Sequence, residues 1–538
     1  MQSSDERYQR LKQLARLGDQ EAARALQSAA ARRADWRGRA EALLAGEPRR
    51  ETWQALVDEL DRRAQLEGGD VEWLEERLVS WPPHLRTAPN TWTRRALLDD
   101  SPPWAALARV WGVRSVKLTD LELTTLLRRP ELQSAWGLRF TGAFLDRSSV
   151  RRIVRSLGNS VRALDLSHNL TGPDAAEALE GAARGALQRL ELAGNKLGQG
   201  APALWAGAPW PRLTVLDLAH NGIQSGDLAA LTGLPWPALE RLSLGANRID
   251  ENGVPTLLGA LPECLSELDL SGNSISDFGA AAIASSSLRL TRLHLAECSI
   301  RGGGAAALGA APLTATLHEL DLWRNPLGGS GSSALFAADF PHLERLDVGF
   351  AACGDEALRV LARATAPRLR HLGLESNNLQ PPGLAALGAS DGLRALSHLV
   401  LDRNPKAMKG LGPFMAALDE GRLPAVTALS LAHSRLDERA LSALAQSPGL
   451  SRLTELHLAH NRIDDAGVRA LADSAYVGGL QRLDLLANPV SEEGVSALVE
   501  SDALPSLSWL RLPSEGFSAE FRQRLASSSL ARRCRIEL

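Results

Sequence analysis

An eleven-residue pattern of leucines and polar residues, L-x-x-L-x-L-x-x-N-x-L, recurs along most of the chain. Successive copies begin 25 to 30 residues apart between Val161 and Leu507. Clear copies begin at Leu187, Leu213, Leu239, Leu265, Leu290, Leu317, Leu369, Leu453 and Leu480. Weaker copies begin at Val161, Leu343, Leu396 and Val426, and degenerate ones at Val113, Ala135 and Leu507. This period predicts stacked structural repeats, in which each unit buries its core against its neighbours.

Each repeat is expected to contain a strand and a helix. The L-x-L centre alternates apolar and polar positions, which is typical of a short strand with every second side chain inward. The second half has helical periodicity, as in residues 464–474, where Asp464 can cap the helix and Val468 and Leu471 share one face. Because strands pack about 4.8 Å apart and helices need about 10 Å, the stack should curve with its strands inside.

The ninth position of the pattern is usually asparagine. Its side-chain amide can bond the exposed backbone of the turn after the strand and of the next repeat. We therefore expect a ladder of structural amides at Asn195, Asn221, Asn247, Asn273, Asn325, Asn377, Asn461 and Asn488. Cys298 replaces the asparagine in one repeat and Cys353 occupies an inward position, so both are expected to be buried structural thiols.

This repeat resembles that of the leucine-rich-repeat family, in particular the helix-containing subclass typified by ribonuclease inhibitor. The resemblance covers roughly residues 113–512, although the repeat is slightly shorter than is usual in that subclass. It implies an α/β fold, a solenoid of about 16 repeats with a curved parallel sheet inside and helices outside. Relatives of this type include the inhibitor of ribonuclease and the GTPase-activating protein of Ran, which regulate an enzyme by contact.

The two ends of the chain differ from the repeats. Residues 1–112 hold seven of the 13 tryptophans and contain two amphipathic helical segments, at 51–66 and 71–81. We expect an all-α N-terminal cap whose tryptophans shield the open end of the solenoid, with a separate effector module as the alternative. Residues 513–538 are expected to form a C-terminal cap that consists of a helix and an edge strand.

Composition gives no sign of a nucleic-acid-binding or membrane protein. Lys+Arg total 60 and Asp+Glu 63, a formal net charge of −3, whereas phosphate-binding surfaces of nucleic-acid proteins carry a basic excess. No run approaches the about 18 apolar residues that span a membrane, and the polar first ten residues differ from a secretory signal. Four cysteines are too few for a disulfide framework, which favours a reducing cytoplasm, and the scarcity of lysine suggests a bacterial source.

Motifs for catalysis, cofactors and metals are missing from the sequence. It has no G-x-x-x-x-G-K-[ST] loop, no G-x-G-x-x-G after a strand, no H-E-x-x-H and no C-x-x-C. We therefore expect no cofactor, no metal and no catalytic residue. His371 and His398 should be neighbours on two strands, but Glu375 and Asp402 lie four residues further along and cannot complete a metal site with them.

The third, fifth and seventh positions of the pattern should face the concave side. Third positions alternate between Arg and Glu in the middle repeats, and fifth positions are mainly acidic. The fifth positions are Asp165, Glu191, Asp217, Ser243, Asp269, His294, Asp321, Asp347, Gly373, Val400, Ser430, His457 and Asp484. Two interpretations are open: the rows steer a basic protein partner, or they are solvated charges that neutralise one another.

One place on this face combines aromatic and charged residues, as binding hot spots do. The seventh position is usually small, but Trp323 breaks this rule and is followed by Arg324, and Phe350 takes the matching loop position in the next repeat. We predict a partner-binding site formed by Asp321, Trp323, Arg324, Arg345, Asp347 and Phe350. The alternative is that Phe350 folds inward because its repeat is irregular and that Trp323 covers it.

The longest repeat begins at Leu396 and contains the loop 401–421. Three basic residues of this loop extend the predicted partner-binding set: Arg403, Lys406 and Lys409. The loop also contains three large apolar residues: Met408, Phe414 and Met415. Methionine-rich surfaces adapt to partners, so the loop is a second candidate contact. The alternative is that its apolar side chains pack on the solenoid.

Three functions compete. The first is a non-catalytic scaffold that binds an unidentified protein partner on its concave face, as a monomer by default. The second is a contact regulator of an enzyme, GTPase-activating-like or inhibitor-like, for which Arg324 or Arg403 would supply the arginine. The third is an enzyme within residues 1–112, where Glu75 and Glu76 are adjacent on a helix and do not face each other. The scaffold is favoured.

Overall fold

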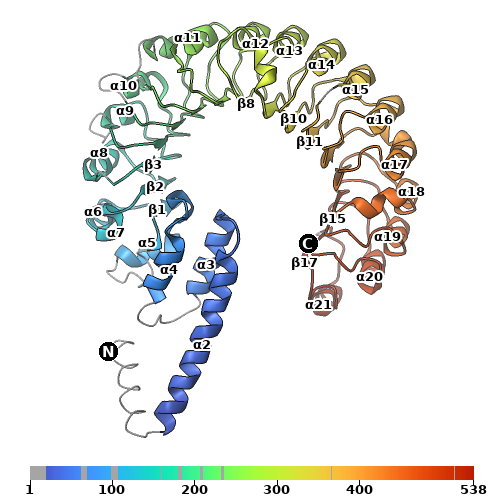
Figure 1. Cartoon of the computed structure of the whole chain (residues 1–538), viewed down its shortest axis with the longest axis horizontal. Coiled ribbons are helices and arrows are strands. Elements are labelled where there is room, and N and C mark those ends of the chain that lie inside the picture. The colour runs from blue at the N-terminus through green and yellow to red at the C-terminus, as the bar shows by residue number, and fades with distance from the viewer. Residues whose placement is uncertain are drawn as a thin grey trace. The chain divides into compact units, whose positions relative to one another are not determined.

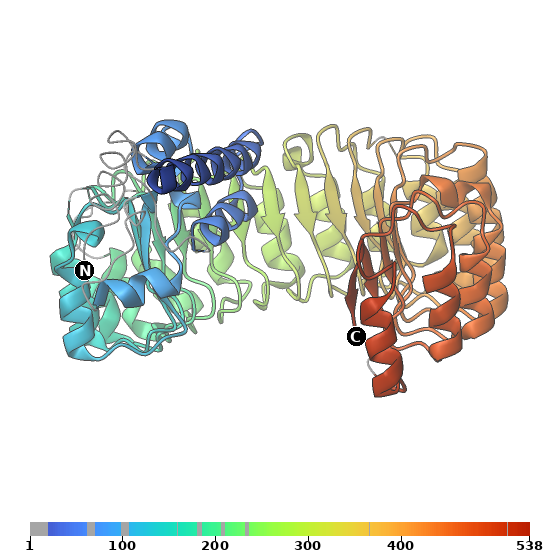
Figure 2. The same cartoon turned by 90° about the horizontal axis from the view of Figure 1, so that it is seen from below.

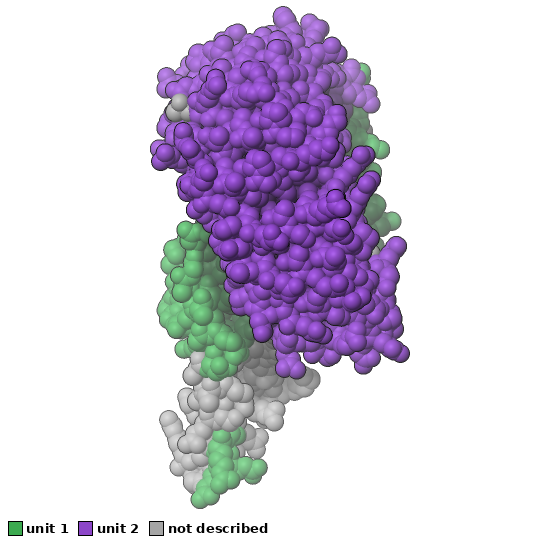
Figure 3. Space-filling model, turned by 90° about the vertical axis from the view of Figure 1, so that its right-hand side faces the viewer, with its two compact units in different colours: residues 1–221, 235–238 green, residues 222–234, 239–538 purple. Residues whose placement is uncertain are grey.

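The computed structural model describes residues 20–61, 70–97, 107–158, 160–179, 185–205, 210–231, 236–364, 366–513 and 515–538. The chain divides into two compact units, one of residues 1–221 and 235–238 and one of residues 222–234 and 239–538 (Figure 3). We call them unit 1 and unit 2 and describe each by itself.

Unit 1 begins with helices and continues into parallel strands. Its α-helices are α2 (Gln20–Leu44), α3 (Arg50–Asp61), α4 (Asp70–Leu78), α5 (Asn90–Leu97), α6 (Asp120–Leu127), α7 (Pro130–Gln133), α8 (Arg147–Ser156), α9 (Asp174–Ala178) and α10 (Pro202–Trp205). Its 3-10 helices are η1 (Pro83–Leu85) and η4 (Gly198–Gly200). Its strands, which pair in parallel in chain order, are β1 (Val110–Arg114), β2 (Gly137–Thr141), β3 (Ala163–Asp165), β4 (Arg189–Glu191) and β5 (Val215–Asp217).

Tryptophans form much of the core around the first helices and β1. Trp53, Trp92 and Trp111 are each at most 2% exposed. The Trp53 Nε1–H donates to the carbonyl of Thr87 at 2.8 Å, which links α3 to the segment that precedes α5. The indoles therefore join the N-terminal helices to the first strand of unit 1. Trp104 lies outside the described residues, as does the chain before Gln20.

Unit 2 consists of repeated strand–helix pairs. Its strands are β6 (Arg241–Ser243), β7 (Glu267–Asp269), β8 (Arg292–His294), β9 (Glu319–Asp321), β10 (Arg345–Asp347), β11 (His371–Gly373), β12 (His398–Val400), β13 (Ala428–Ser430), β14 (Glu455–His457), β15 (Arg482–Asp484), β16 (Trp509–Arg511) and β17 (Arg535–Glu537). Its α-helices are α11 (Gly253–Ala260), α12 (Ser276–Ala284), α13 (Gly302–Gly309), α14 (Gly328–Phe336), α15 (Gly354–Leu361), α16 (Pro381–Gly388), α17 (Leu411–Asp419), α18 (Glu438–Ala445), α19 (Asp465–Ala472), α20 (Glu492–Glu500) and α21 (Ala519–Ser527). Its 3-10 helices are η5 (Ser225–Leu231), η6 (Pro312–Ala315), η7 (Ala407–Gly410) and η8 (Pro448–Arg452).

The strands of unit 2 lie side by side and are parallel, with identical pattern positions opposite each other (Figure 2). The helices lie on the opposite side of each repeat from the strand face (Figure 1). The prediction of an α/β leucine-rich-repeat solenoid is therefore confirmed. None of the described helices is both long enough and apolar enough to cross a membrane.

The leucines of the pattern hold each repeat to the next. In the repeat that begins at Leu265, the first, fourth and sixth positions, Leu265, Leu268 and Leu270, are at most 1% exposed. Burying one such side chain contributes about 1.5–3 kcal/mol, so several buried leucines per repeat supply the main stabilising free energy. This core leaves the third, fifth and seventh side chains of each strand on the other face, where a partner can reach them.

The ladder asparagines satisfy the backbone of the turns that follow the strands. The Asn325 Nδ2 donates to the carbonyls of Leu295 at 2.7 Å and Leu322 at 3.0 Å. Its Oδ1 accepts the N–H groups of Cys298 at 3.0 Å and Ile300 at 2.9 Å. The structure places the other predicted members in the same kind of position: Asn195, Asn221, Asn247, Asn273, Asn377, Asn461 and Asn488.

The ladder has members that the sequence analysis left out. Asn169 in unit 1 and Asn404 in unit 2 make the same bonds, to the carbonyls of Phe140 at 2.7 Å and Leu374 at 2.9 Å respectively. Cys298 occupies the asparagine position, and its Sγ donates to the carbonyl of Leu270 at 3.2 Å. Burial raises the pKa of the Cys298 thiol to about 12 and that of the Cys353 thiol to about 11. Both cysteines are therefore buried, unreactive thiols.

Candidate partner-binding surface

Charged side chains at the third position alternate in sign across five strands of unit 2. Arg241 lies 3.4 Å from Glu267, Arg292 lies 3.3 Å from Glu267 and 3.6 Å from Glu319, and Arg345 lies 3.4 Å from Glu319. We call these five residues the charge ladder. The side chains of its arginines are 45–53% exposed, so each pair contributes little to stability. The ladder supports the interpretation of charges that neutralise one another.

Two acidic residues at the fifth position accept hydrogen bonds from the backbone of the turns that follow their strands. Asp321 Oδ1 accepts the N–H of Trp323 at 2.9 Å, and Asp347 Oδ1 accepts the N–H of Gly349 at 2.9 Å. Burial, followed by the neighbouring Asp347, raises the pKa of the Asp321 carboxyl. These carboxylates therefore hold the backbone next to the predicted hot spot. Their negative charge is a separate property, on which the steering of a basic partner would depend.

The predicted hot-spot residues Trp323, Arg324 and Phe350 meet at the end of β9 and β10. The rings of Trp323 and Phe350 make an edge-to-face contact, with centroids 5.5 Å apart and planes at 81°. The Arg324 guanidinium lies 4.2 Å from the centroid of Trp323 and 5.2 Å from that of Phe350. We call these three residues the aromatic cluster. Cation–π and aromatic contacts of this geometry hold the three side chains in one arrangement.

The backbone of the next turn makes room for the cluster. A Cβ at Gly349 would stand 2.6 Å from Cδ1 of Trp323, so the indole fits only because this seventh position is glycine. Trp323 and Phe350 are half-buried and Arg324 is exposed. Phe350 lies in the strand-exit turn and does not fold into the core, whereas Ala351 is buried at the ladder position. The cluster thus places two half-buried rings and an exposed guanidinium at the surface of unit 2.

Arg324 and Phe350 occupy the eighth position of the pattern, where the backbone is left-handed. Their φ angles are 54° and 57°, and their N–H groups donate to the next repeat, at Gly349 and Glu375. The equivalent position is Gly272 two repeats before Arg324. A left-handed conformation costs a residue with a side chain about 1–2 kcal/mol relative to glycine. Most repeats nevertheless have a residue with a side chain here, as at Ala246, Glu297 and Ala487, so the left-handed turn belongs to the repeat and is not specific to the aromatic cluster.

Arg403 takes the same position two repeats after Phe350, but in a different setting. Its Nε donates to Glu375 at 2.9 Å, and its Nη2 lies 3.2 Å from Nε2 of His433. The ring of His433 stacks on that of His460, with centroids 4.1 Å apart. Burial lowers the pKa of His433, and the charges of Arg403 and His460 lower it further. This row of turns places the Arg403 guanidinium and two stacked imidazole rings beside one carboxylate, that of Glu375.

The loop 401–421 is less adaptable than a methionine-rich surface would be. Phe414 is 0%, Met415 3% and Met408 9% exposed, so these side chains pack into the core of their repeat. Lys406 and Lys409 are exposed at η7. Arg403, in contrast, bonds Glu375 and lies against His433. The alternative that the apolar side chains pack on the solenoid describes this loop.

The histidines form stacked pairs without a metal-binding geometry. His371 lies opposite His398 across β11 and β12, with ring centroids 4.2 Å apart, and burial lowers the pKa of His371. In the part of the chain that the structure describes, no three residues of the types His, Cys, Asp and Glu converge as metal ligands would.

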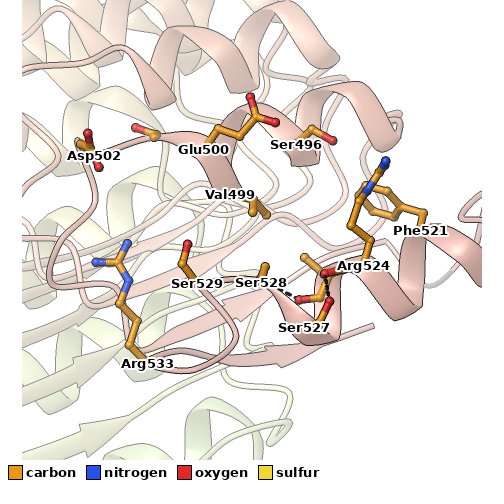
Figure 4. A pocket seen from close by; sticks show the side chains of 12 residues that line it. Ser496, Val499, Glu500, Asp502, Phe521, Arg524, Ser527, Ser528, Ser529 and Arg533 are labelled. Atoms are coloured by element: carbon orange, nitrogen blue, oxygen red, sulfur yellow. Dashed lines mark hydrogen bonds between the residues drawn. The ribbon is translucent and has the colours of Figure 1, made fainter.

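Two hollows of unit 2 lie outside the aromatic cluster. One, of about 500 Å³, opens over the charge ladder between Arg292, Arg345 and His371. The other, of about 720 Å³, lies between α20 and α21, where Glu500 and Asp502 line one side and Arg524 and Arg533 the other (Figure 4). Because acidic and basic side chains balance in both hollows, neither selects a ligand by charge. No predicted partner-binding residue except Arg345 lines them.

Comparisons with known proteins find similar repeats. A family model described as leucine-rich repeat matches residues 212–231, 262–284 and 451–472. No curated protein matches the chain. Among solved structures, the TLR13–ssRNA13 complex has a chain 20% identical to this one, with a TM-score of 0.46, covering 78% of this chain and 58% of that one. This chain thus spans 58% of the length of that relative.

Two further structures are similar at comparable levels. One is the complex of Rad7 and Elc1 in yeast, at 18% identity, a TM-score of 0.43, and coverage of 63% of this chain and 83% of that one. The other is a leucine-rich-repeat protein of Leptospira interrogans, at 19% identity, a TM-score of 0.37, and coverage of 77% and 98%. The repeated strand–helix pairs and the asparagine ladder agree with the leucine-rich repeats that the family model matches in three segments of the chain.

Proposed function

We propose that the protein is a non-catalytic scaffold that binds a protein partner on the strand face of unit 2, with the aromatic cluster as the main contact. The observation that carries this proposal is the cluster itself: two half-buried rings and an exposed guanidinium held together before any partner binds. Tryptophan and arginine dominate binding hot spots, and an ordered cluster loses little side-chain entropy on binding.

The residues around the cluster extend the proposed contact. The left-handed eighth position does not by itself mark this contact, because most repeats carry a side chain there, as at Ala246, Glu297 and Ala487. Arg324 and Phe350 differ from these residues in that their side chains meet Trp323. We infer that Asp321, Asp347 and Arg345 contribute to partner contact around the cluster and that Arg403, Lys406 and Lys409 contribute further along unit 2.

The regulatory and enzymatic alternatives have less support. An arginine that completes another enzyme's site must reach out, but Arg324 pairs with Glu297 at 3.3 Å and Arg403 with Glu375 at 2.9 Å. In the N-terminal region Glu75 lies 3.7 Å from Arg109, and both Glu75 and Glu76 are exposed. Exposed carboxylates of this kind lack the burial that tunes a catalytic acid or base.

Subclass and location complete the proposal. A helix follows most strands of unit 2, which supports the ribonuclease-inhibitor-like subclass. The low number of cysteines, four in 538 residues, supports a reducing cytoplasm, and the scarcity of lysine supports a bacterial source. We propose no nucleic-acid ligand, because the strand face of unit 2 balances its charges, and we take the monomer as the working state.

The test is affinity capture with the full chain as bait, comparing wild type with Trp323→Ala/Phe350→Ala. A matched control is Phe278→Ala, which removes a ring that is 58% exposed on α12, on the helix side. We expect a protein that wild type and the control retain and the double variant loses, with all three baits equally folded by circular dichroism. A partner retained by every bait would remove the aromatic cluster from the proposal.

A further inference from the structure

A small cavity in unit 1 is lined by three arginines and by no carboxylate among the described residues. Its volume is about 170 Å³, and Arg50, Arg114 and Arg139 come from three different elements, α3, β1 and β2. This differs from the strand face of unit 2, where every arginine of the charge ladder has a glutamate neighbour.

The floor of the cavity is the backbone of the first two strands. Gly112 pairs with Arg139 in the parallel register of β1 and β2. A Cβ at Gly112 would stand 1.6 Å from the carbonyl oxygen of Arg139, so only glycine fits and the floor has no side chain there. Arg114 lies two residues further along β1, on the same face of the strand. The close approach of the two strand backbones at Gly112 therefore forms the floor beside Arg114 and Arg139.

The walls are fixed by hydrogen bonds. Asn90 bonds the backbone of Arg114 twice, with Nδ2 donating to the carbonyl at 3.0 Å and Oδ1 accepting the N–H at 3.1 Å. Trp53 bonds Thr87 as described above, which places the first turn of α3, with Arg50, at the rim. These bonds fix the backbone around the cavity without the help of a ligand.

The arginines keep free donors. No described residue forms an ion pair or hydrogen bond with the guanidinium of Arg50 or Arg114. Arg139 uses its Nε for Asp165, at 3.1 Å. Arg50 also begins helix α3, where the helix dipole disfavours a cation. Three positive side chains around one cavity repel one another, and a bound anion would reverse that repulsion.

We propose that this cavity binds a phosphate group, either free inorganic phosphate or the phosphate of a small monoester. Water occupies about 30 Å³, so the cavity has room for about five water-sized groups, and phosphate has five non-hydrogen atoms. The planar guanidinium group matches two phosphate oxygens at once, which makes arginine the usual residue for this recognition. The site is independent of the partner contact proposed for unit 2.

The experiment is a titration of the full chain with inorganic phosphate, followed by calorimetry and by ³¹P line broadening, against chloride at equal ionic strength. We expect saturable binding that Arg114→Gln and Arg50→Gln each weaken by about tenfold or more, since each removes charge-assisted hydrogen bonds. Arg151→Gln, which removes an exposed arginine from α8, is the matched control and should bind as wild type does.

A second titration with methyl phosphate separates the two sources of the ligand. Binding of the ester as tight as that of phosphate assigns a monoester, and binding of phosphate alone assigns the free anion. Failure of both to bind above chloride overturns the proposal, and so does binding by Arg50→Gln and Arg114→Gln equal to that of wild type. Because Arg50 is exposed, Arg50→Gln decides the question even if Arg114→Gln does not fold.

Discussion

The arginines on the strands of the two units differ in whether carboxylates surround them. In unit 2, Arg292 lies between two glutamates of neighbouring strands. In unit 1, Arg114 shares a cavity with two other arginines, and none of the described residues that line it is a carboxylate. The regular repeats neutralise their own charges, whereas the irregular first strands leave charges for something else to neutralise. In a repeat protein, a charged residue without a counter-charge in its neighbouring repeats is therefore a better guide to function than the regular, neutralised surface.

The largest expected effect concerns the contribution of the asparagine ladder to the stability of the regular repeats. Asn325→Ala removes four hydrogen bonds to buried backbone and should lower the free energy of unfolding by about 2–4 kcal/mol, measured by guanidinium unfolding. Asn325→Cys should cost less, because Cys298 fills this position in a neighbouring repeat. Stability of Asn325→Ala equal to that of wild type would mean that the ladder is dispensable.

The aromatic cluster offers the next largest effect. Gly349→Ala pushes a methyl group into the indole of Trp323 and should lower the free energy of unfolding by about 1–3 kcal/mol. In a Trp323→Ala background the same change should cost much less, because the clash is gone. A double-mutant cycle measures the difference. If the cost is the same in both backgrounds, the ring does not occupy the space above Gly349.

The two arginine settings should give effects of opposite sign. Arg292→Gln breaks two ion pairs and should lower the free energy of unfolding by about 0.5 kcal/mol at low salt. Arg114→Gln relieves repulsion and should raise it by a similar amount in phosphate-free buffer, about 0.5 kcal/mol. Thermal unfolding at low ionic strength compares them. A loss of stability in both variants would show that Arg114, like Arg139, already has an internal counter-charge.

The smallest expected effect concerns His433. Its pKa in the folded chain is below that of the unfolded chain, so folded protein binds this proton less readily. Stability from this group is present at neutral pH and is lost as pH falls through the unfolded pKa of about 6.5. His433→Gln should therefore flatten the fall in melting temperature between pH 7.5 and 5.5. An unchanged slope would assign that fall to other groups that titrate in this range.

The repeat pattern was enough to predict the fold, because strand, turn and helix each depend on local spacing. The same pattern located Trp323, Arg324 and Phe350 in adjacent turns, although it did not decide whether Phe350 points inward. Asn169 and Asn404 were left out of the ladder because their repeats are weaker copies, yet the ninth position alone would have found them.

The cavity of unit 1 lay beyond sequence analysis. It depends on a helix that begins at Arg50 approaching a strand pair in which Arg139 stands, and no local pattern relates residues so far apart. The burial of Met408, Phe414 and Met415 was likewise undecided, because a short apolar run has the same sequence in a surface loop and in a packed helix.

The asparagine ladder also determines the order in which the repeats can fold during translation. The N–H groups of Cys298 and Ile300 are satisfied by Asn325, which belongs to the following repeat. A ribosome makes these residues before it makes their acceptor, so the newest repeat on a growing chain ends in a turn with unmet donors. Each repeat matures only when its successor emerges, and folding should follow translation one repeat behind.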